Sequence, residues 1–254
     1  MQKKELGVYI HIPFCAKKCI YCDFISFENK LDLQGQYVEK LLEEINNEKD
    51  LFKDYKITTI YIGGGTPSII NEDLIGKILS MIDRESDAEI TIELNPGTVT
   101  KQKLINYKNF GINRLSIGLQ STKNEILKQI GRIHNYEKFL ESYKYAEDVG
   151  YDNINLDLMI GIPNQSIQDI KDSINKIVNL KPAHISVYSL IIEPNTPLEN
   201  MVDKNILKLP SDEDERMQYS YVKNSLELKG YKHYEISNFA IDGKYSKHNM
   251  NCWE

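Results

Sequence analysis

The stretch Gly7–Cys22, GVYIHIPFCAKKCIYC, decides the fold of this chain. Its beginning, residues 7–12, predicts a strand because β-branched and aromatic residues dominate it. Three cysteines follow at once with the spacing C-x3-C-x2-C: Cys15, Cys19 and Cys22. The chain therefore opens with a strand that leads directly into a loop of thiols.

The cysteine spacing indicates a metal site. Thiolates are the usual protein ligands of iron–sulfur clusters, and three of them leave one iron of a four-iron cluster open to a small molecule. A structural zinc site, with His11 or Cys252 as the fourth ligand, is the alternative that the spacing leaves open. His11 is also well explained as a core histidine inside the strand. Because the chain has four cysteines and three of them crowd together, a disulfide framework is not indicated.

Strand-like and helix-like segments alternate after the cysteines. Strands are predicted at 58–62, 89–93, 114–119, 153–159 and 184–188, and helices at 33–50, 72–82, after Thr100, at 123–130, 136–149 and 166–179. Such alternation implies a parallel sheet with right-handed crossovers. Because about six units are fewer than the eight of a full barrel, we expect an α/β fold with a partial (β/α)6 TIM-like barrel over residues 1–191.

The pattern changes at residue 192. A turn-rich link, 193–197, precedes a predicted helix at 211–229 that Ser211 caps, and residues 234–236 are expected to form an edge strand. Residues 192–254 therefore predict a small α+β extension of the core.

Composition narrows the functional classes. The 254 residues carry a net charge of −6, which argues against a general binder of nucleic acid or of anionic membranes. No stretch has the length and apolar character of a signal peptide or a transmembrane helix, so we expect a cytoplasmic protein without a stable membrane span.

Polar residues recur where the predicted strands end. Gly63-Gly64-Gly65-Thr66-Pro67 follows the second strand, and its glycines allow a ligand to approach the backbone, although it is neither a dinucleotide nor a P-loop motif. Glu93, Gln120, Asp157 and Tyr188 lie at the ends of the next four strands. Parallel α/β folds bind ligands at this edge, so we expect these residues to face one cavity with the thiols. Taken singly, Glu93 or Asp157 is explained equally well as a helix cap or a partner of a lysine.

Two basic side chains are weaker candidates. Arg132 could bind a carboxylate through two hydrogen bonds, although a surface arginine fits its spacing equally well. His248, near Trp253, could bind a porphyrin or a metal because histidine is a common haem ligand, but from spacing alone a structural role is favoured.

Seven segments resemble, in the same order, the radical SAM coproporphyrinogen III oxidase-like family, where SAM is S-adenosylmethionine. They are 9–24 with its three cysteines, GGGTPS at 63–68, ELNP at 93–96, GLQS at 118–121, Gly131-Arg132, NLDLM at 155–159 and YEISNFA at 234–240. The resemblance covers nearly the whole chain. It implies the partial barrel of radical SAM proteins, and in family members a larger C-terminal domain of which residues 192–254 would be the beginning.

The resemblance also implies a set of cofactors. Cys15, Cys19 and Cys22 would hold a [4Fe–4S] cluster, and SAM would bind its fourth iron. An electron, supplied by a flavodoxin- or ferredoxin-like donor, would then cleave SAM to methionine and a 5′-deoxyadenosyl radical. The implied SAM contacts are Tyr9, Tyr21, Gly64, Gly65, Thr66, Glu93, Gln120, Arg132, Asp157 and, through its backbone, Ile191.

Two branches of this family differ at Phe24. The oxygen-independent oxidase, which converts propionates of coproporphyrinogen III to vinyl groups, has a further cysteine at this position, whereas the haem chaperone branch does not. The resemblance therefore favours a haem chaperone that passes haem to acceptor proteins, with the oxidase as the alternative. The chaperone branch has a His-Asn-x-x-Tyr-Trp motif, which here is His248-Asn249-Met250-Asn251-Cys252-Trp253, so His248 is the implied haem ligand although Cys252 replaces the tyrosine.

Overall fold

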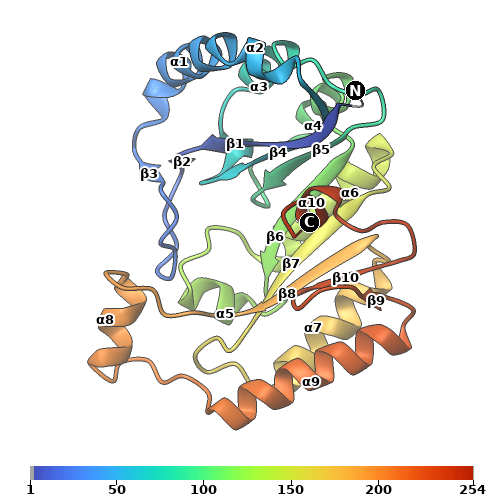
Figure 1. Ribbon diagram of the computed structural model, residues 1–254. Coiled ribbons are helices and arrows are strands. Elements are labelled where there is room, and N and C mark those ends of the chain that lie inside the picture. The colour runs from blue at the N-terminus through green and yellow to red at the C-terminus, as the bar shows by residue number, and fades with distance from the viewer. Residues whose placement is uncertain (1–2, 254) are drawn as a thin grey trace.

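The computed structural model describes residues 3–253 and contains one large, mostly parallel sheet (Figure 1). Six parallel strands follow one another in the order of the chain, and two short antiparallel strands extend the sheet beyond the sixth. The parallel strands are β1 (Lys4–Ile12), β4 (Tyr55–Gly64), β5 (Glu89–Leu94), β6 (Arg114–Gln120), β7 (Ile154–Ile160) and β8 (His184–Ser189), and the additional ones are β10 (Asn238–Ala240) and β9 (Lys232–His233). All six strands predicted for residues 1–191 are confirmed.

Helices connect the strands and cover one face of the sheet (Figure 1). The connecting helices are α1 (Gln34–Asn47), α2 (Lys49–Phe52), α3 (Glu72–Ser80), α4 (Lys101–Asn109), α5 (Asn124–Gln129), α6 (Tyr136–Val149) and α7 (Ile167–Asn179), with 3-10 turns η1 (Leu31–Leu33) and η2 (Pro67–Ile69) and the short strands β2 (Phe14–Cys15) and β3 (Phe27–Glu28). The predicted α/β fold is confirmed. Within the described residues, β1 pairs only with β4, so the curved sheet is an open, partial barrel.

Side-chain capping explains where the helices begin. Thr100 and Ser166 each accept a hydrogen bond from the third residue of the helix that follows, and the sequence predicts the cap at Thr100. Ser211 caps α9 (Asp212–Leu228) in the same way, and the Asp214 carboxylate accepts a hydrogen bond from Ser211 N. Gly150 ends α6 with φ of 84°, a conformation that glycine adopts without a steric penalty.

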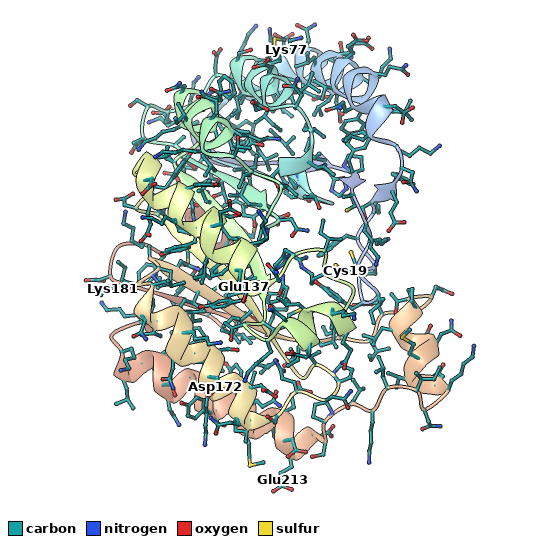
Figure 2. The ribbon with its side chains drawn as sticks, turned by 180° about the vertical axis from the view of Figure 1, so that it is seen from behind. Cys19, Lys77, Glu137, Asp172, Lys181 and Glu213 are labelled. Carbon is teal, nitrogen blue, oxygen red and sulfur yellow. The ribbon has the colours of Figure 1, made fainter. Side chains whose placement is uncertain are left out.

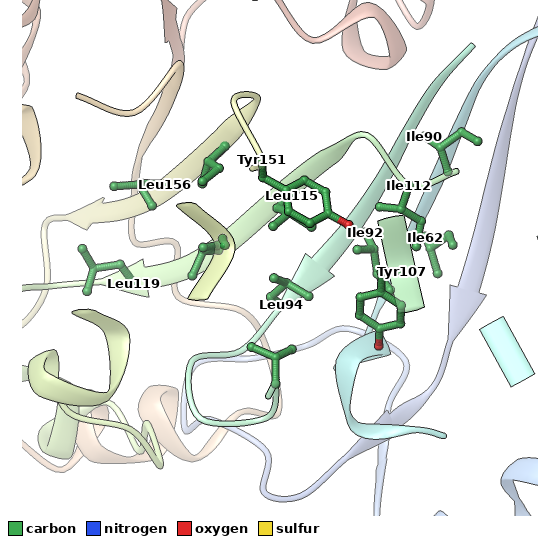
Figure 3. Close-up of a cluster of buried hydrophobic side chains, with 14 of the residues drawn as sticks. Ile62, Ile90, Ile92, Leu94, Tyr107, Ile112, Leu115, Leu119, Tyr151 and Leu156 are labelled. Carbon is green, nitrogen blue, oxygen red and sulfur yellow. The ribbon is translucent and has the colours of Figure 1, made fainter. Parts of the chain in front are cut away.

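The strands present an apolar face to the helices. Ile62, Ile92, Leu115 and Leu156 are almost fully buried there (Figure 3), where they contribute to the main hydrophobic core. Alternate residues of the same strands point to the opposite, inner face, because successive side chains of a strand lie on opposite sides of the sheet. This inner face is polar and carries Thr59, Tyr61, Glu89, Thr91, Glu93, Arg114, Ser116, Asn155, Asp157, His184, Ser186 and Tyr188.

The C-terminal segment packs on both faces of the sheet. α9 lies against α7 on the outer face, whereas α10 (Lys247–Asn251) packs on β1 and β4 from the inner face. β10 pairs antiparallel with β8 and so continues the core sheet. Residues 192–253 therefore make extensive contacts with the partial barrel. No helix of the described residues combines the length and hydropathy needed to cross a membrane.

Two predictions for this segment were wrong. Residues 234–236 do not form an edge strand, because they make the connection between β9 and β10, where Tyr234 N donates to Asn238 O over 3.2 Å. Helix α8 (Pro197–Asp203) begins inside the stretch that the sequence predicts as a link. Its Thr196 cap and Pro197 at the first turn are ordinary helix-start signals, which the prolines around them obscured.

We expect Ser166→Ala to destabilise the chain by about 1 kcal/mol. The two hydrogen bonds of Ser166 Oγ, from Asp169 N and to Asp169 Oδ2, would be lost at the start of α7. Urea unfolding followed by circular dichroism measures this change. Ser166→Thr, which keeps both the cap acceptor and the hydroxyl donor to Asp169, serves as the matched control and should remain much closer to the parent chain. An unchanged unfolding midpoint for Ser166→Ala would contradict the role of the cap.

Candidate metal and SAM site

One cavity of about 280 Å³ opens at the carboxyl ends of the parallel strands. Its wall includes the cysteine loop, the glycine loop and the residues at the ends of the next strands, as the sequence predicts. Of the predicted site residues, the wall contains Cys15, Cys19, Tyr21, Cys22, Gly64, Gly65, Thr66, Glu93, Gln120, Arg132, Asp157 and Ile191, together with Tyr188. Segments more than 170 residues apart in sequence thus face one space.

Backbone hydrogen bonds fix the cysteine loop from both sides. Ile20 N donates to Ile130 O over 3.2 Å, and Leu198 N at the start of α8 donates to Ile20 O over 2.9 Å. Gly131 has φ of 80° and lies against the loop, where a Cβ would approach Ile20 to 3.3 Å. The loop is therefore shaped by residues far along the chain as well as by its own sequence.

The three thiols of this loop are free and half-buried. Figure 2 shows Cys19 close to α5, with its side chain among those that fill the interior. Burial raises the pKa of Cys22, so its thiolate needs a compensating positive charge or metal. Within residues 3–253, no three His, Cys, Asp or Glu side chains are grouped closely enough to hold one metal ion.

The glycine loop contacts the cysteine loop directly. Gly65 N donates to Ile12 O over 2.9 Å, and Thr66 N donates to Phe14 O over 2.7 Å. A Cβ on Gly65 would lie 2.7 Å from Phe14 O and 3.0 Å from Cys15 Sγ. Only glycine permits this approach, because real Cβ contacts are not that short.

Two carboxylates share the inner wall. Tyr61 OH donates to Glu93 Oε1 over 3.0 Å, and Gly64 N donates to Glu93 Oε2 over 3.1 Å. Burial and the nearby charge of Asp157 nevertheless raise the pKa of Glu93 to about 7, and burial also raises the pKa of Asp157. A cationic ligand in this cavity would favour the ionised form of both groups.

Arg132 lies beside the thiols. Its Nη1 is 3.7 Å from Cys19 Sγ, and its Nη2 donates to Asn95 Oδ1 over 3.1 Å and to Gly118 O. Its Nε is buried and has no hydrogen-bond partner among the described residues. Burial and the Arg132 charge lower the pKa of the adjacent His134 to about 3, so this imidazole is neutral beside the guanidinium.

Gln120 is positioned by an unusual backbone. It has φ of 68°, which non-glycine residues rarely adopt, and follows a register shift between β6 and β7. Its side chain is buried, and its Oε1 accepts a hydrogen bond from Tyr188 OH over 2.9 Å. Alternation along β6 directs Gln120 towards the cavity and Leu119 into the outer core, and the register shift lies between Gly118 and Gln120.

Two predicted site residues lie outside the cavity wall. Tyr9 is 53% exposed, and its OH is 3.0 Å from His11 Nδ1. His248 lies on the inner face near the beginnings of the strands, where its Nδ1 is 2.9 Å from Thr59 Oγ1 and its ring stacks on Tyr61. The zinc alternative gains no fourth ligand here, because neither His11 nor Cys252 lines the cavity and both His11 nitrogens are engaged.

Residues that sequence reasoning missed also line or support the cavity. Asn95 Oδ1 accepts a hydrogen bond from Arg132, and Ser116 Oγ donates to Asp157 over 3.2 Å. The alternation along 114–120 and 153–159 could have found Ser116 and Asn155, because both share a face with the predicted residues at the strand ends.

The Radical SAM superfamily family model matches residues 9–177 of the chain. This chain belongs to the radical SAM superfamily. Members of the superfamily hold a [4Fe–4S] cluster and SAM, so the cavity must be tested for its fit to these two groups.

Similar proteins confirm the expected resemblance to the haem chaperone branch. Heme chaperone HemW of Bacillus subtilis is 41% identical over 252 residues, which are 97% of this chain and 66% of the relative. Heme chaperone HemW of Lactococcus lactis is 36% identical over 258 residues, which are 100% of this chain and 67% of the relative. The chain thus spans about two thirds of the length of these relatives.

A solved structure shows the same fold. Coproporphyrinogen III oxidase (HemN) from Escherichia coli matches with a TM-score of 0.85 and 26% identity, over 95% of this radical SAM chain and 56% of the oxidase chain. The similarity supports the partial barrel over nearly the whole chain.

The residues of the cavity fit the two groups that the superfamily implies. Three thiols are available from one loop, and the glycine loop lacks the Cβ atoms that would fill the adjacent space. The positive charge of Arg132 in the cavity wall suits an anionic group, and Glu93 and Asp157 suit a cationic one. An amino acid with a sulfonium, such as SAM, carries both kinds of charge.

We expect Gly65→Ala to lower the iron and sulfide content of this radical SAM protein several-fold after anaerobic reconstitution. The added Cβ would collide with Phe14 O and press on Cys15 Sγ, displacing the cysteine loop. Gly35→Ala is the matched control, because a Cβ at this α1 position meets nothing within 4 Å. A full complement of iron in Gly65→Ala would show that the close approach is not required.

We expect Glu93→Gln to stabilise the cofactor-free chain at pH 8 by on the order of 2 kcal/mol and to change little at pH 5. A carboxyl with a folded pKa of about 7 loses stability as pH rises from its unfolded value of about 4.5 to 7, because the unfolded chain releases its proton first. Glutamine is neutral throughout, and its amide can bond both Gly64 N and Tyr61 OH. Urea unfolding at the two pH values measures the difference.

Glu137→Gln is the control for this measurement, because Glu137 is exposed and its pKa is lowered by backbone and Asn124 hydrogen bonds. No gain at pH 8 is expected for it. Equal effects of Glu93→Gln at both pH values would contradict the raised pKa.

Proposed function

We propose that this chain is the radical SAM core of a haem chaperone, which binds haem and passes it to acceptor proteins. The similarity to two curated haem chaperones over nearly the full chain is the observation that carries the proposal. Phe24 supports it, because the oxidase branch has a cysteine at this position. The side chain of Phe24 lines the cavity and is 64% exposed.

We assign Cys15, Cys19 and Cys22 as the ligands of the [4Fe–4S] cluster. All three face the cavity from a loop held in place by Ile130 and Leu198. With SAM bound, the cluster supplies one-electron reductive cleavage that yields a 5′-deoxyadenosyl radical.

The other cavity residues would bind and orient SAM. The positive charge of Arg132 would attract the SAM carboxylate, while Glu93 and Asp157 would attract the positive charges of SAM. Gln120, fixed by Tyr188, would donate its amide hydrogens to the ligand because its oxygen is already occupied. Gly64, Gly65 and Thr66 would present backbone groups, as would Ile191 at the opposite wall.

Two further predicted residues are assigned different roles. Tyr21 lines the cavity next to Arg132 and contributes part of the wall. Tyr9 lies below the cavity wall, where it supports Tyr61, the hydrogen-bond donor to Glu93.

His248 is the proposed haem ligand. Its Nδ1 lies at hydrogen-bond distance from Thr59, and its side chain is buried between α10, to which it belongs, and the sheet. Iron ligation through Nε2 therefore requires α10 to move away from β4. The haem site would therefore be separate from the cavity that holds the thiols. The protein is proposed to act in the cytoplasm, where a reducing environment keeps its thiols reduced and a flavodoxin- or ferredoxin-like donor can reduce a cluster.

Oxygen-independent coproporphyrinogen III oxidase is the second candidate. The structural similarity to the Escherichia coli oxidase favours it, since the same partial barrel supports that activity there. The two functions differ in product, because the oxidase converts two propionates of the porphyrinogen into vinyl groups whereas a chaperone leaves haem chemically unchanged.

We expect the anaerobically reconstituted protein to bind haem with a shifted Soret band and to form no protoporphyrinogen IX from coproporphyrinogen III in the presence of SAM and dithionite. Absorption spectroscopy and product chromatography measure the two outcomes. His248→Ala should weaken haem binding about tenfold or more, because an axial ligand is lost. Formation of protoporphyrinogen IX would overturn the chaperone assignment in favour of the oxidase.

Replacing Cys15, Cys19 and Cys22 together by serine should remove the brown chromophore and most of the iron. Cys252→Ser is the matched control and should retain both, because Cys252 is exposed directly after α10 and does not line the cavity. Iron content unaffected by the triple change, or stoichiometric zinc in place of iron, would contradict the cluster assignment.

A further inference from the structure

A continuous chain of hydrogen bonds runs through the inner face from the cavity to the C-terminal segment. We propose that Asn155, His184 and Tyr234 are positioning residues, which hold the Asp157 carboxylate in its orientation and make SAM binding depend on residues 234–246. The proposal rests on the assignment of Asp157 as a SAM contact and adds three residues that do not line the cavity.

Asp157 receives two hydrogen bonds from the inner face. Asn155 Nδ2 donates to Asp157 Oδ1 over 2.7 Å, and Ser116 Oγ donates to Asp157 Oδ2 over 3.2 Å. Asn155 Nδ2 also donates to Ser116 Oγ over 2.8 Å. Both carboxylate oxygens are thus fixed, and both amide hydrogens of Asn155 are used.

The donor pattern determines the tautomer of His184. Because the Asn155 amide donates on one side, its Oδ1 must accept on the other, and His184 Nδ1 lies 2.6 Å from it. His184 Nδ1 therefore carries the proton. His184 Nε2 must then accept, and Tyr234 OH lies 2.7 Å from it as the donor.

The series of hydrogen bonds ends at the backbone of the C-terminal segment. Ser246 N donates to Tyr234 Oη over 3.2 Å, directly before α10. Every donor and acceptor is satisfied when the bonds point one way, from Ser246 through Tyr234, His184 and Asn155 to Asp157. Such aligned bonds polarise one another and favour negative charge at the accepting end.

Burial makes this arrangement costly to disturb. Asn155 is 2% exposed, and both His184 and Ser246 are 0% exposed, so water cannot replace a lost partner. Burial and the Arg114 charge lower the pKa of His184 well below its usual range, which agrees with the neutral tautomer that the geometry requires. Ser186 Oγ lies within hydrogen-bond distance of Asn155 Oδ1 and of Asn238 Oδ1 and can donate its single hydrogen to one of them at a time, so β8 and β10 meet beside Asn155.

SAM binding to the anaerobically reconstituted protein, measured by titration calorimetry, tests the proposal. We expect Asn155→Ala to weaken SAM binding about tenfold and Tyr234→Phe about threefold, with unchanged iron content. Tyr231→Phe is the matched control, because it also removes a buried hydroxyl of the C-terminal segment. This hydroxyl donates to Pro182 O over 2.8 Å and takes no part in the hydrogen bonds that lead to Asp157. It should leave SAM affinity within about twofold.

A double-mutant cycle separates positioning from general loss of stability. In an Asp157→Asn background, Tyr234→Phe should cause no further loss of SAM affinity, because the group that it positions has been replaced. Additive losses in the cycle, or parent-like affinity in both Asn155→Ala and Tyr234→Phe, would overturn the proposal.

The tautomer of His184 provides a readout that does not depend on SAM. Nitrogen-15 correlation spectra should show a neutral ring with its proton on Nδ1, and Tyr234→Phe should perturb the Nε2 resonance. A proton on Nε2 would refute the proposed chain even if SAM binds. A parent protein that loads a cluster and shows this tautomer but does not bind SAM would instead refute the proposed SAM site.

Discussion

The contact between the glycine loop and the cysteine loop is the constraint on which the site depends. The backbone of Gly65 and Thr66 bonds to Ile12 and Phe14, so the end of β4 is joined to the chain that carries the thiols. A side chain at Gly65 would occupy the space of Phe14 O and Cys15 Sγ. The loops that follow the adjacent strands β1 and β4 are therefore in contact, and both line the cavity.

The two faces of the sheet differ in polarity, and this difference determines where the helices and the site residues lie. Apolar residues of the parallel strands are covered by helices, and their burial provides most of the stabilising apolar area. The opposite face carries hydroxyls, amides and charges, each of which requires partners once it is removed from water. Neighbouring strands supply many of these partners, as the bonds from Asn155 and Ser116 to Asp157 show, and α10 supplies others.

Glu93, whose pKa is raised, and Arg132, whose Nε has no partner among the described residues, line the same cavity. Carboxyls and a guanidinium surround the cavity without pairing with each other, so each keeps its capacity for a ligand. A zwitterionic, sulfonium-bearing ligand matches that distribution of charge. The polar inner face is therefore suited both to bind a charged cofactor and to connect its site with the C-terminal segment.

The sequence by itself determined the order of strands and helices, because hydrophobic periodicity and capping residues are local signals. All six parallel strands and the caps at Thr100 and Ser211 follow from them. It also placed the thiols, the glycine loop and the strand-end residues at one edge, because parallel strands share the direction of their carboxyl ends. Only the tertiary structure decided the path of 232–240, the register shift before Gln120, the packing of His248 against Thr59 and the bonds that link Asp157 to Tyr234. These features depend on contacts between residues far apart in the chain, for which a single sequence carries no local signal.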